Sequence, residues 1–239
     1  MIEMILSKNL MKARAVFGLF EANSVGDDIS VGKMGKEILR FRTLRQQLQK
    51  KAGIANLALS DFIAPEDSGL QDYIGAFCVS VFGADELVDQ YKKDHDDYHA
   101  ILVQALADRF AEAFAEYLHL QIRTKHWGYA SEENLENDEL IGEAYTGIRP
   151  APGYPACPDH LEKDSIWALL EVEKNIGVKL TESKAMWPAS SVSGYYFAHP
   201  EAKYFGLGKI TEEQVTDYAG RKGISKEEAE RWLQPNLSY

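Results

Sequence analysis

The stretch Ala84–Arg123 constrains the fold more than any other part of the chain. Its apolar residues recur at intervals of three and four positions, which is the spacing of one helical face. These residues are Tyr98, Ile101, Leu102, Ala105, Leu106, Ala113, Phe114, Tyr117 and Leu118. Because the stretch is longer than a usual globular helix, we expect a break near Asp94–Asp97, with Asp96 or Asp97 as the N-cap. The sequence therefore predicts a long, interrupted helix in the middle of the chain.

Segments rich in β-branched and aromatic residues lie on both sides of this helix. We expect strands at Ala13–Phe20, Asp28–Val31, Ile38–Arg42, Tyr73–Val81, Leu180–Met186, Ser191–Ala198 and Lys203–Gly208. Shorter helices are predicted at Leu135–Tyr145 and Glu162–Ile176, and capping boxes at Thr211–Gln214 and Ser225–Glu228 predict two closing helices. This order indicates an α+β fold, with a mostly antiparallel twisted β-sheet and flanking helices.

Composition excludes several classes of protein. The 239 residues contain 26 Lys+Arg and 37 Asp+Glu, a net charge of −11, which argues against a nucleic-acid partner because such proteins concentrate positive charge. No apolar run reaches the roughly 18 residues of a membrane span, and no signal peptide is evident. The two cysteines, Cys78 and Cys157, are too few for a disulfide framework. We therefore expect a cytoplasmic protein that acts neither in a membrane nor on nucleic acid.

The loop Arg149–His160 is the strongest candidate for a ligand-binding segment. It holds four prolines and one glycine in the sequence Arg-Pro-Ala-Pro-Gly-Tyr-Pro-Ala-Cys-Pro-Asp-His. Prolines preset the backbone, so such a loop loses little entropy when it binds a ligand. Arg149 offers a guanidinium fork that suits a carboxylate or a phosphate, and Tyr154 offers a flat aromatic face.

Further side chains fit the same kind of ligand. Tyr204 and Phe205 form a second aromatic pair, and Glu112, Glu116 and Glu143 supply carboxylates. Together with Arg149 these groups suit a zwitterion that carries an additional positive charge. Taken singly, however, each feature is more often structural: prolines connect helices, tyrosines pack, and Glu112 with Glu116 forms a solvated helix face.

Two other kinds of site are less well supported by the residues of this loop. Cys157 and His160 form half of a possible zinc site, but no second ligand pair with suitable spacing follows. The same two residues are a conceivable nucleophile and base of a hydrolase, yet residues three apart in a proline-rich loop rarely face each other. The remaining histidines are scattered singly, so no acid-base pair is evident and we name no catalytic residue.

The loop Arg149–His160 closely resembles the signature loop of the activation domain of cobalamin-dependent methionine synthases. Segments that resemble the same family are Ala22–Asp28, Asp72–Phe77, Ala105–Arg109, Ala113–His119, Leu180–Ser183 and Ala185–Pro188. The resemblance is continuous from about Ala13 to the C-terminus. It implies the fold of that domain and a role in methionine biosynthesis, as part of a methyltransferase.

The resemblance also implies ligands and site residues. Domains of this family bind S-adenosylmethionine and present its methyl group to cobalamin that has been oxidised out of the catalytic cycle, after an electron donor has reduced the cobalt. By resemblance, Arg149 holds the ligand carboxylate, Ala151 offers backbone hydrogen bonds and Tyr154 contacts the ligand. Tyr204 and Phe205 line the adenosine side, and Glu112 and Glu143 support the arginine and the polar end of the ligand.

The resemblance finally implies partners and a domain boundary. Cobalamin is expected on a separate domain of the same enzyme, and a flavodoxin-like protein is expected as the electron donor, for which Arg40, Arg42, Arg45, Lys50 and Lys51 are candidate contacts. We expect residues 1–12 to lie outside the resemblance, and 13–239 to form an activation domain incomplete at its N-terminus. Such a chain makes no methionine by itself. The alternative is a module that keeps this fold for interaction or assembly and binds no ligand.

Overall fold

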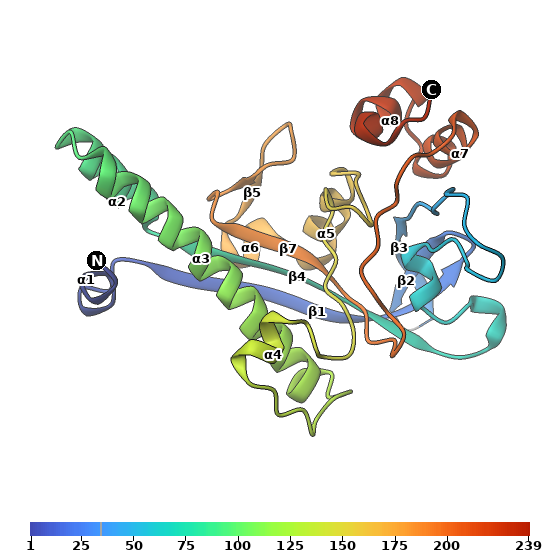
Figure 1. The fold of residues 1–239 in the computed structure, drawn as a ribbon, viewed down its shortest axis with the longest axis horizontal. Helices are drawn as coiled ribbons and strands as arrows, with labels where there is room; N and C mark the ends of the chain where they lie inside the picture. Colours follow the sequence, from blue (N-terminus) through green and yellow to red (C-terminus); the bar gives the residue numbers. More distant parts are fainter. Residues whose placement is uncertain (34) are drawn as a thin grey trace.

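A five-stranded antiparallel sheet forms the centre of the computed structural model, which describes residues 1–33 and 35–239 (Figure 1). Its strand order is β3-β2-β1-β4-β7. The strands are β1 (Lys12–Val25), β2 (Asp28–Lys33), β3 (Lys36–Arg42), β4 (Asp72–Phe82) and β7 (Ser191–Tyr196). All neighbouring strands in this sheet are antiparallel, as the sequence predicts. Strand β7 occupies one edge of the sheet, and this position matters for the site.

Eight α-helices surround the sheet in the described chain. They are α1 (Ile2–Ser7), α2 (Ala84–Lys93), α3 (Asp97–Gln121), α4 (Asn137–Ile141), α5 (Glu162–Leu170), α6 (Val172–Ile176), α7 (Glu212–Lys222) and α8 (Lys226–Leu233). The predicted break before α3 is confirmed, and the Asp96 carboxylate caps that helix by accepting from His99 N at 3.0 Å. The two closing helices are confirmed as well, with Thr211 and Ser225 as their N-caps. None of the described helices has the length and apolar character required to cross a membrane.

The helices cover both faces of the sheet. Successive side chains of a strand point to opposite faces, and in β4 Phe77 and Val79 pack with Ala115 and Leu118 of α3. Their neighbours Ala76 and Cys78 instead pack with residues of α5 and α6. Figure 1 shows α3 crossing the strands. The molecule therefore has three layers, with α3 on one face of the sheet and α5 with α6 on the other.

The buried face of α3 is not the one that the larger apolar residues indicate. Ala100, Val103, Ala107, Ala111 and Ala115 are buried. Three larger members of the predicted stripe are exposed instead, namely Tyr98 (73%), Ile101 (65%) and Tyr117 (57%). The predicted helical spacing is confirmed, but most residues of the predicted set, Leu118 excepted, lie outside the buried face. Small side chains face the sheet because they allow the helix backbone to approach it closely.

Four shorter predictions differ from the structure. Within Leu135–Tyr145 only the short helix α4 forms. The helix predicted over Glu162–Ile176 breaks at Glu171, whose φ is 45°, into α5 and α6. Leu180–Met186 is mostly the turn of a small hairpin between β5 (Lys179–Leu180) and β6 (Met186–Trp187). Lys203–Gly208 is not a strand, because its backbone pairs with the proline-rich loop through Leu207 N and Pro155 O at 2.8 Å.

Candidate functional site

The loop Arg149–His160 connects α4 to α5 and is fastened to the outer edge of β7. Tyr195 N donates to Pro150 O at 2.9 Å, and Ile148 and Phe197 exchange two backbone hydrogen bonds of 3.0 Å each. Within the loop, Gly153 N donates to Cys157 O at 2.8 Å. The sheet edge and the backbone of the loop itself therefore hold the loop in one shape.

A cavity of about 960 Å³ lies beside this loop. It is lined by residues of α3, β7, the loop, the start of α5 and the segment that follows β7. All seven residues that the resemblance implies line it: Glu112, Glu143, Arg149, Ala151, Tyr154, Tyr204 and Phe205. The fold thus brings together side chains from four separate segments of the chain. A cavity of this volume is typical of sites for small ligands.

Arg149 uses only one side of its guanidinium to contact the protein. Its Nη1 lies 2.6 Å from Glu116 Oε2, donates to the Tyr145 hydroxyl at 2.8 Å and lies 3.3 Å from His119 Nδ1. Within the described residues, neither Nε nor Nη2 makes a hydrogen bond. Burial disfavours the charge, but Tyr145 and Glu116 more than compensate, so the pKa of Arg149 lies above its ordinary value. A charged fork is therefore available to an anionic group in the cavity.

Glu116 is the carboxylate that supports Arg149, and the resemblance did not include it among the site residues. Glu112 instead pairs with Arg109 at 2.7 Å, and both side chains are largely exposed. Among the described residues, no hydrogen bond or ion pair joins Glu143 to Arg149. The expectation that Glu112 and Glu143 support the arginine therefore needs correction. The sequence held a signal for Glu116, because it lies one helical turn after Glu112 and one turn before the buried His119.

A second arginine lies behind the first. Arg123 is fully buried, and its Nε and Nη2 donate to the Glu133 carboxylate at 2.8–3.1 Å. Its guanidinium lies 4.0 Å from the centre of the Tyr145 ring. It also lies near Glu116, at 3.8 Å between Nη1 and Oε1. Two arginines and two carboxylates thus form one partly buried charge network beneath the cavity.

The three aromatic residues differ in how firmly they are held. The Tyr204 hydroxyl accepts from Arg149 N at 3.0 Å, which ties the segment after β7 to the start of the loop. Phe205 packs against the edge of the main core, with its ring 6.4 Å from that of Phe62. Tyr154 is 66% exposed. Tyr204 and Phe205 therefore form a fixed wall of the cavity, whereas the Tyr154 ring is open to solvent.

Ala151 has one free backbone group. Its carbonyl accepts from Tyr154 N at 3.1 Å and from Cys157 Sγ at 2.9 Å. No hydrogen bond of its N–H occurs within the described chain. The amide, rather than the carbonyl, is thus the group that Ala151 offers to a ligand.

Cys157 and His160 do not form a catalytic pair or half of a metal site. The Cys157 thiol is buried and donates to Ala151 O, while the His160 ring packs over Gly153. Burial, followed by the nearby Glu162 and Asp159, raises the pKa of the Cys157 thiol well above its ordinary value. In the described part of the chain, no group of three or more His, Cys, Asp or Glu side chains is arranged to hold a metal ion.

We expect Cys157 to be unreactive in the native protein, because the thiolate is the nucleophile and burial disfavours it. Iodoacetamide at neutral pH should leave the thiol unmodified until the chain is unfolded in urea, as measured by mass spectrometry. Rapid alkylation of Cys157 in the folded chain would show that this thiol is accessible and ionised.

Gly153 is required by the shape of the loop. Its φ is +95°, and a Cβ added there would overlap the His160 ring. We expect Gly153→Ala to lower the free energy of unfolding by about 1–3 kcal/mol in urea titrations. Gly220→Ala is the matched control, because Gly220 lies in α7 and a Cβ there meets nothing within 4 Å. Equal effects of the two substitutions would contradict this account of the loop.

His119 makes the stability of the protein sensitive to acid. Burial, followed by the charges of Arg123 and Arg149, lowers the pKa of His119 from 6.5 to about 2. Below its ordinary pKa the unfolded chain binds a proton that the folded chain does not. The free energy of unfolding should therefore fall by about 1.4 kcal/mol for each pH unit below about 6.5. Urea titrations should show a smaller fall for His119→Phe, and an identical fall would contradict this assignment.

Most of the basic residues considered for an electron donor are already engaged. Arg40 pairs with Glu37 at 2.6 Å, and Arg42 donates to Arg221 O at 2.6 Å. Arg45 binds both Asp27 and Asp61, and Lys50 donates to Ala55 O at 2.7 Å. Lys51 is exposed. The carboxylate partners of Arg40 and Arg45 offset part of the positive charge that the sequence suggested for this region.

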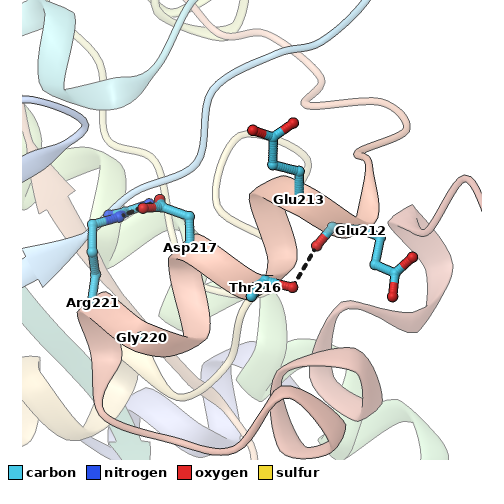
Figure 2. Close-up of a pocket in the computed structure, with 6 residues that line it drawn as sticks. All are labelled: Glu212, Glu213, Thr216, Asp217, Gly220 and Arg221. Carbon is cyan, nitrogen blue, oxygen red and sulfur yellow. Dashed lines mark hydrogen bonds and ion pairs between the residues drawn. The ribbon is translucent and has the colours of Figure 1, made fainter.

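Another hollow lies on the surface of α7 and differs in character (Figure 2). It is lined by Glu212, Glu213, Thr216, Asp217, Gly220 and Arg221, all from this one helix. Figure 2 shows Arg221 paired with Asp217, while Glu212 and Glu213 point away from each other. These side chains do not converge on a common point. The cavity beside the loop is therefore the better candidate for a ligand site.

The fold and the cavity define an α+β domain with a cavity of a size suited to a small ligand beside strand β7, next to a proline-rich loop. The sequence profile described as "Vitamin B12 dependent methionine synthase, activation domain" matches residues 1–223. The chain belongs to this family. It is also similar to a crystal structure of the MetH reactivation domain bound to AdoHcy. That match has 55% sequence identity and a TM-score of 0.97, and covers 100% of this chain and 74% of the other. Both matches include residues 1–12, which were expected to lie outside the resemblance.

Proposed function

We propose that this chain binds S-adenosylmethionine in the cavity beside the loop Arg149–His160 and presents its methyl group for the reactivation of oxidised cobalamin. The observation that supports this most strongly is the free edge of Arg149. Its Nε and Nη2 lack partners within the described chain, while Nη1 is held by Glu116, Tyr145 and His119. That edge suits the carboxylate of an amino acid tail, because two parallel hydrogen bonds match its two oxygens.

The rest of the cavity suits the remaining parts of the ligand. A sulfonium is a soft cation, and aromatic faces and carboxylates both attract it. Tyr154, Tyr204 and Phe205 supply the aromatic faces, and Glu112 and Glu143 supply the charge. The Ala151 amide can donate to an acceptor on the adenosine. AdoHcy, bound by the similar MetH structure, is S-adenosylmethionine without its methyl group, so both ligands share the carboxylate, the amine and the adenosine, and they differ at the sulfur, which is a neutral thioether in AdoHcy.

The residues of this chain bind and orient the ligand rather than react with it. When the methyl group leaves, the electron pair of the carbon–sulfur bond stays on sulfur, and S-adenosylhomocysteine remains in the cavity. Cobalamin, carried by another domain of the enzyme, supplies the metal centre that accepts the methyl group. The contribution of the cavity is to position the methyl group and to exclude water around it. We therefore assign no catalytic acid or base to this chain.

The proposal includes the partners that the family implies. The chain acts as part of a methyltransferase and makes no methionine in isolation. Its expected partners are a cobalamin-binding domain of the same enzyme and a flavodoxin-like electron donor. Because Arg40, Arg42 and Arg45 already pair with other groups, contacts of an acidic donor are expected to depend only weakly on them.

Ligand-dependent stabilisation tests the proposed function. A ligand that binds only the folded chain raises the midpoint of thermal unfolding in a concentration-dependent way. S-adenosylmethionine and S-adenosylhomocysteine should both do so, whereas ATP at the same concentration should not. A native-like unfolding transition that neither nucleoside shifts would favour the alternative, a module for interaction or assembly that binds no ligand.

A further inference from the structure

His119 lies directly behind the ligand-binding arginine, in the interior of the protein. It belongs to α3 and is fully buried. Its ring stacks on that of Tyr196, at 5.1 Å between centroids and an interplanar angle of 13°. The Tyr145 ring meets it edge-on at 4.9 Å. Tight packing on two sides therefore fixes the plane of the imidazole.

The imidazole must act as an acceptor toward Arg149. A guanidinium can only donate hydrogen bonds, and its Nη1 lies 3.3 Å from His119 Nδ1. Nδ1 is therefore unprotonated, and in the neutral ring the proton is on Nε2. Burial and the positive charges of Arg123 and Arg149 lower the pKa of His119 to about 2, which agrees with a neutral ring.

This arrangement leaves a polar atom without a partner. His119 Nε2 is buried and makes no hydrogen bond within the described chain. A buried donor without an acceptor destabilises the folded state, and a phenylalanine ring would fill a similar space without that cost. Packing alone therefore does not explain an imidazole at this position. The property that a phenylalanine would lack is the acceptor that faces Arg149.

We propose that His119 is a positioning residue for the carboxylate of the ligand, and that it favours ligands that carry this carboxylate. Glu116, Tyr145 and His119 contact the same nitrogen, Nη1, from different directions. Together they fix the rotation of the guanidinium and direct its free edge away from them. This inference rests on the proposed function, because it assigns that edge to the carboxylate.

Paired ligands test the inference in calorimetric titrations of the full chain. S-adenosylmethionine and its decarboxylated form share the sulfonium, the amine and the adenosine, and only the carboxylate differs. His119→Phe should weaken binding of S-adenosylmethionine by about fivefold to tenfold, because one of the three contacts that orient the guanidinium is lost, and binding of the decarboxylated form by less than about twofold. His119→Asn should restore most of the loss, because its amide oxygen can occupy the position of Nδ1.

A comparison of two amide substitutions at His119 keeps the inference testable if His119→Phe fails to fold. His119→Asn places an oxygen near the position of Nδ1, whereas His119→Gln places its amide nearer Nε2. We expect selectivity for the carboxylate to survive in the first variant and to fall in the second. Equal weakening for both ligands, or unchanged selectivity in His119→Phe and His119→Gln, would overturn the inference while leaving the proposed function intact. Failure of the unmodified chain to bind S-adenosylmethionine would overturn both.

Discussion

Arg149→Ala is expected to weaken binding of S-adenosylmethionine by about 100-fold. The substitution removes two charge-assisted hydrogen bonds to the carboxylate of the ligand, which together correspond to roughly 3 kcal/mol. It also leaves Glu116, whose side chain is 25% exposed, without its closest cation. The resulting negative charge beneath the cavity should further oppose the carboxylate. Calorimetric titration of the two proteins measures the effect directly.

Arg40→Ala is the matched control for this substitution. Arg40 lies on strand β3 and pairs with Glu37 in an exposed contact, outside the cavity. An exposed pair of this kind contributes little, so the affinity for S-adenosylmethionine should change by less than about twofold. Should the two alanine variants bind the ligand equally well, Arg149 would not be the residue that holds the carboxylate.

Arg123→Met is expected to lower the free energy of unfolding by about 3–5 kcal/mol. Arg123 is fully buried, and its removal leaves the Glu133 carboxylate, 7% exposed, without a partner in the protein interior. The stacking of the guanidinium on Tyr145 is also lost. For a domain of this size, the midpoint of thermal unfolding should fall by roughly 10 °C. Thermal and urea unfolding, followed by circular dichroism, measure both quantities.

The double variant Arg123→Met with Glu133→Leu distinguishes two causes of the lost stability, an unpaired buried charge and lost packing. Because it removes both charges, most of the lost stability should return, as is found when a buried ion pair is replaced by apolar residues. If the single variant unfolded at the same temperature as the unmodified protein, Arg123 would have no structural role. If the double variant were no more stable than the single one, packing rather than unpaired charge would explain the loss.

Much of the fold was predictable because it depends on local patterns. The five strands of the main sheet follow from runs of β-branched and aromatic residues, and Gly32 and Gly35 indicated a short connection between two antiparallel strands. The starts of α3, α7 and α8 were also predictable, because each has an N-cap side chain next to it in the sequence: Asp96, Thr211 and Ser225. Such signals depend on a few neighbouring residues, so they can be read without the tertiary structure.

The orientation of α3 was not predictable in the same way. Two apolar sets share this helix, one with larger side chains such as Tyr98 and Ile101 and one mostly of alanines. From periodicity alone, the more hydrophobic set is expected to face the core. In the structure the alanine set faces the sheet, because small side chains allow the helix to lie close to it. Lys203–Gly208 was misjudged for a related reason, because its backbone pairs with the loop, through Leu207 N and Pro155 O, rather than with the sheet. Both outcomes depend on contacts between distant segments.

The candidate site was only partly readable from the residues alone. The prolines of the loop, Arg149 and Tyr154 indicated a rigid platform for a ligand, whereas the specific ligand came from the family resemblance. The residue pattern grouped Glu116 with Arg149 as one of three carboxylates of the site, whereas the family resemblance did not include it. Neither approach identified His119 as a partner of Arg149, because α3 and the loop meet only in the folded chain. The available signal was the helical spacing of three polar residues, Glu116, His119 and Arg123, within a largely apolar stretch.

A crystal structure of this chain with S-adenosylmethionine would locate the ligand directly. The ligand should lie in the cavity beside β7, with its carboxylate on Nε and Nη2 of Arg149 and its adenosine against Tyr204 and Phe205. Arg149 should keep its contacts with Glu116 and His119 in the complex. A ligand bound elsewhere, or a carboxylate that points away from Arg149, would contradict the account.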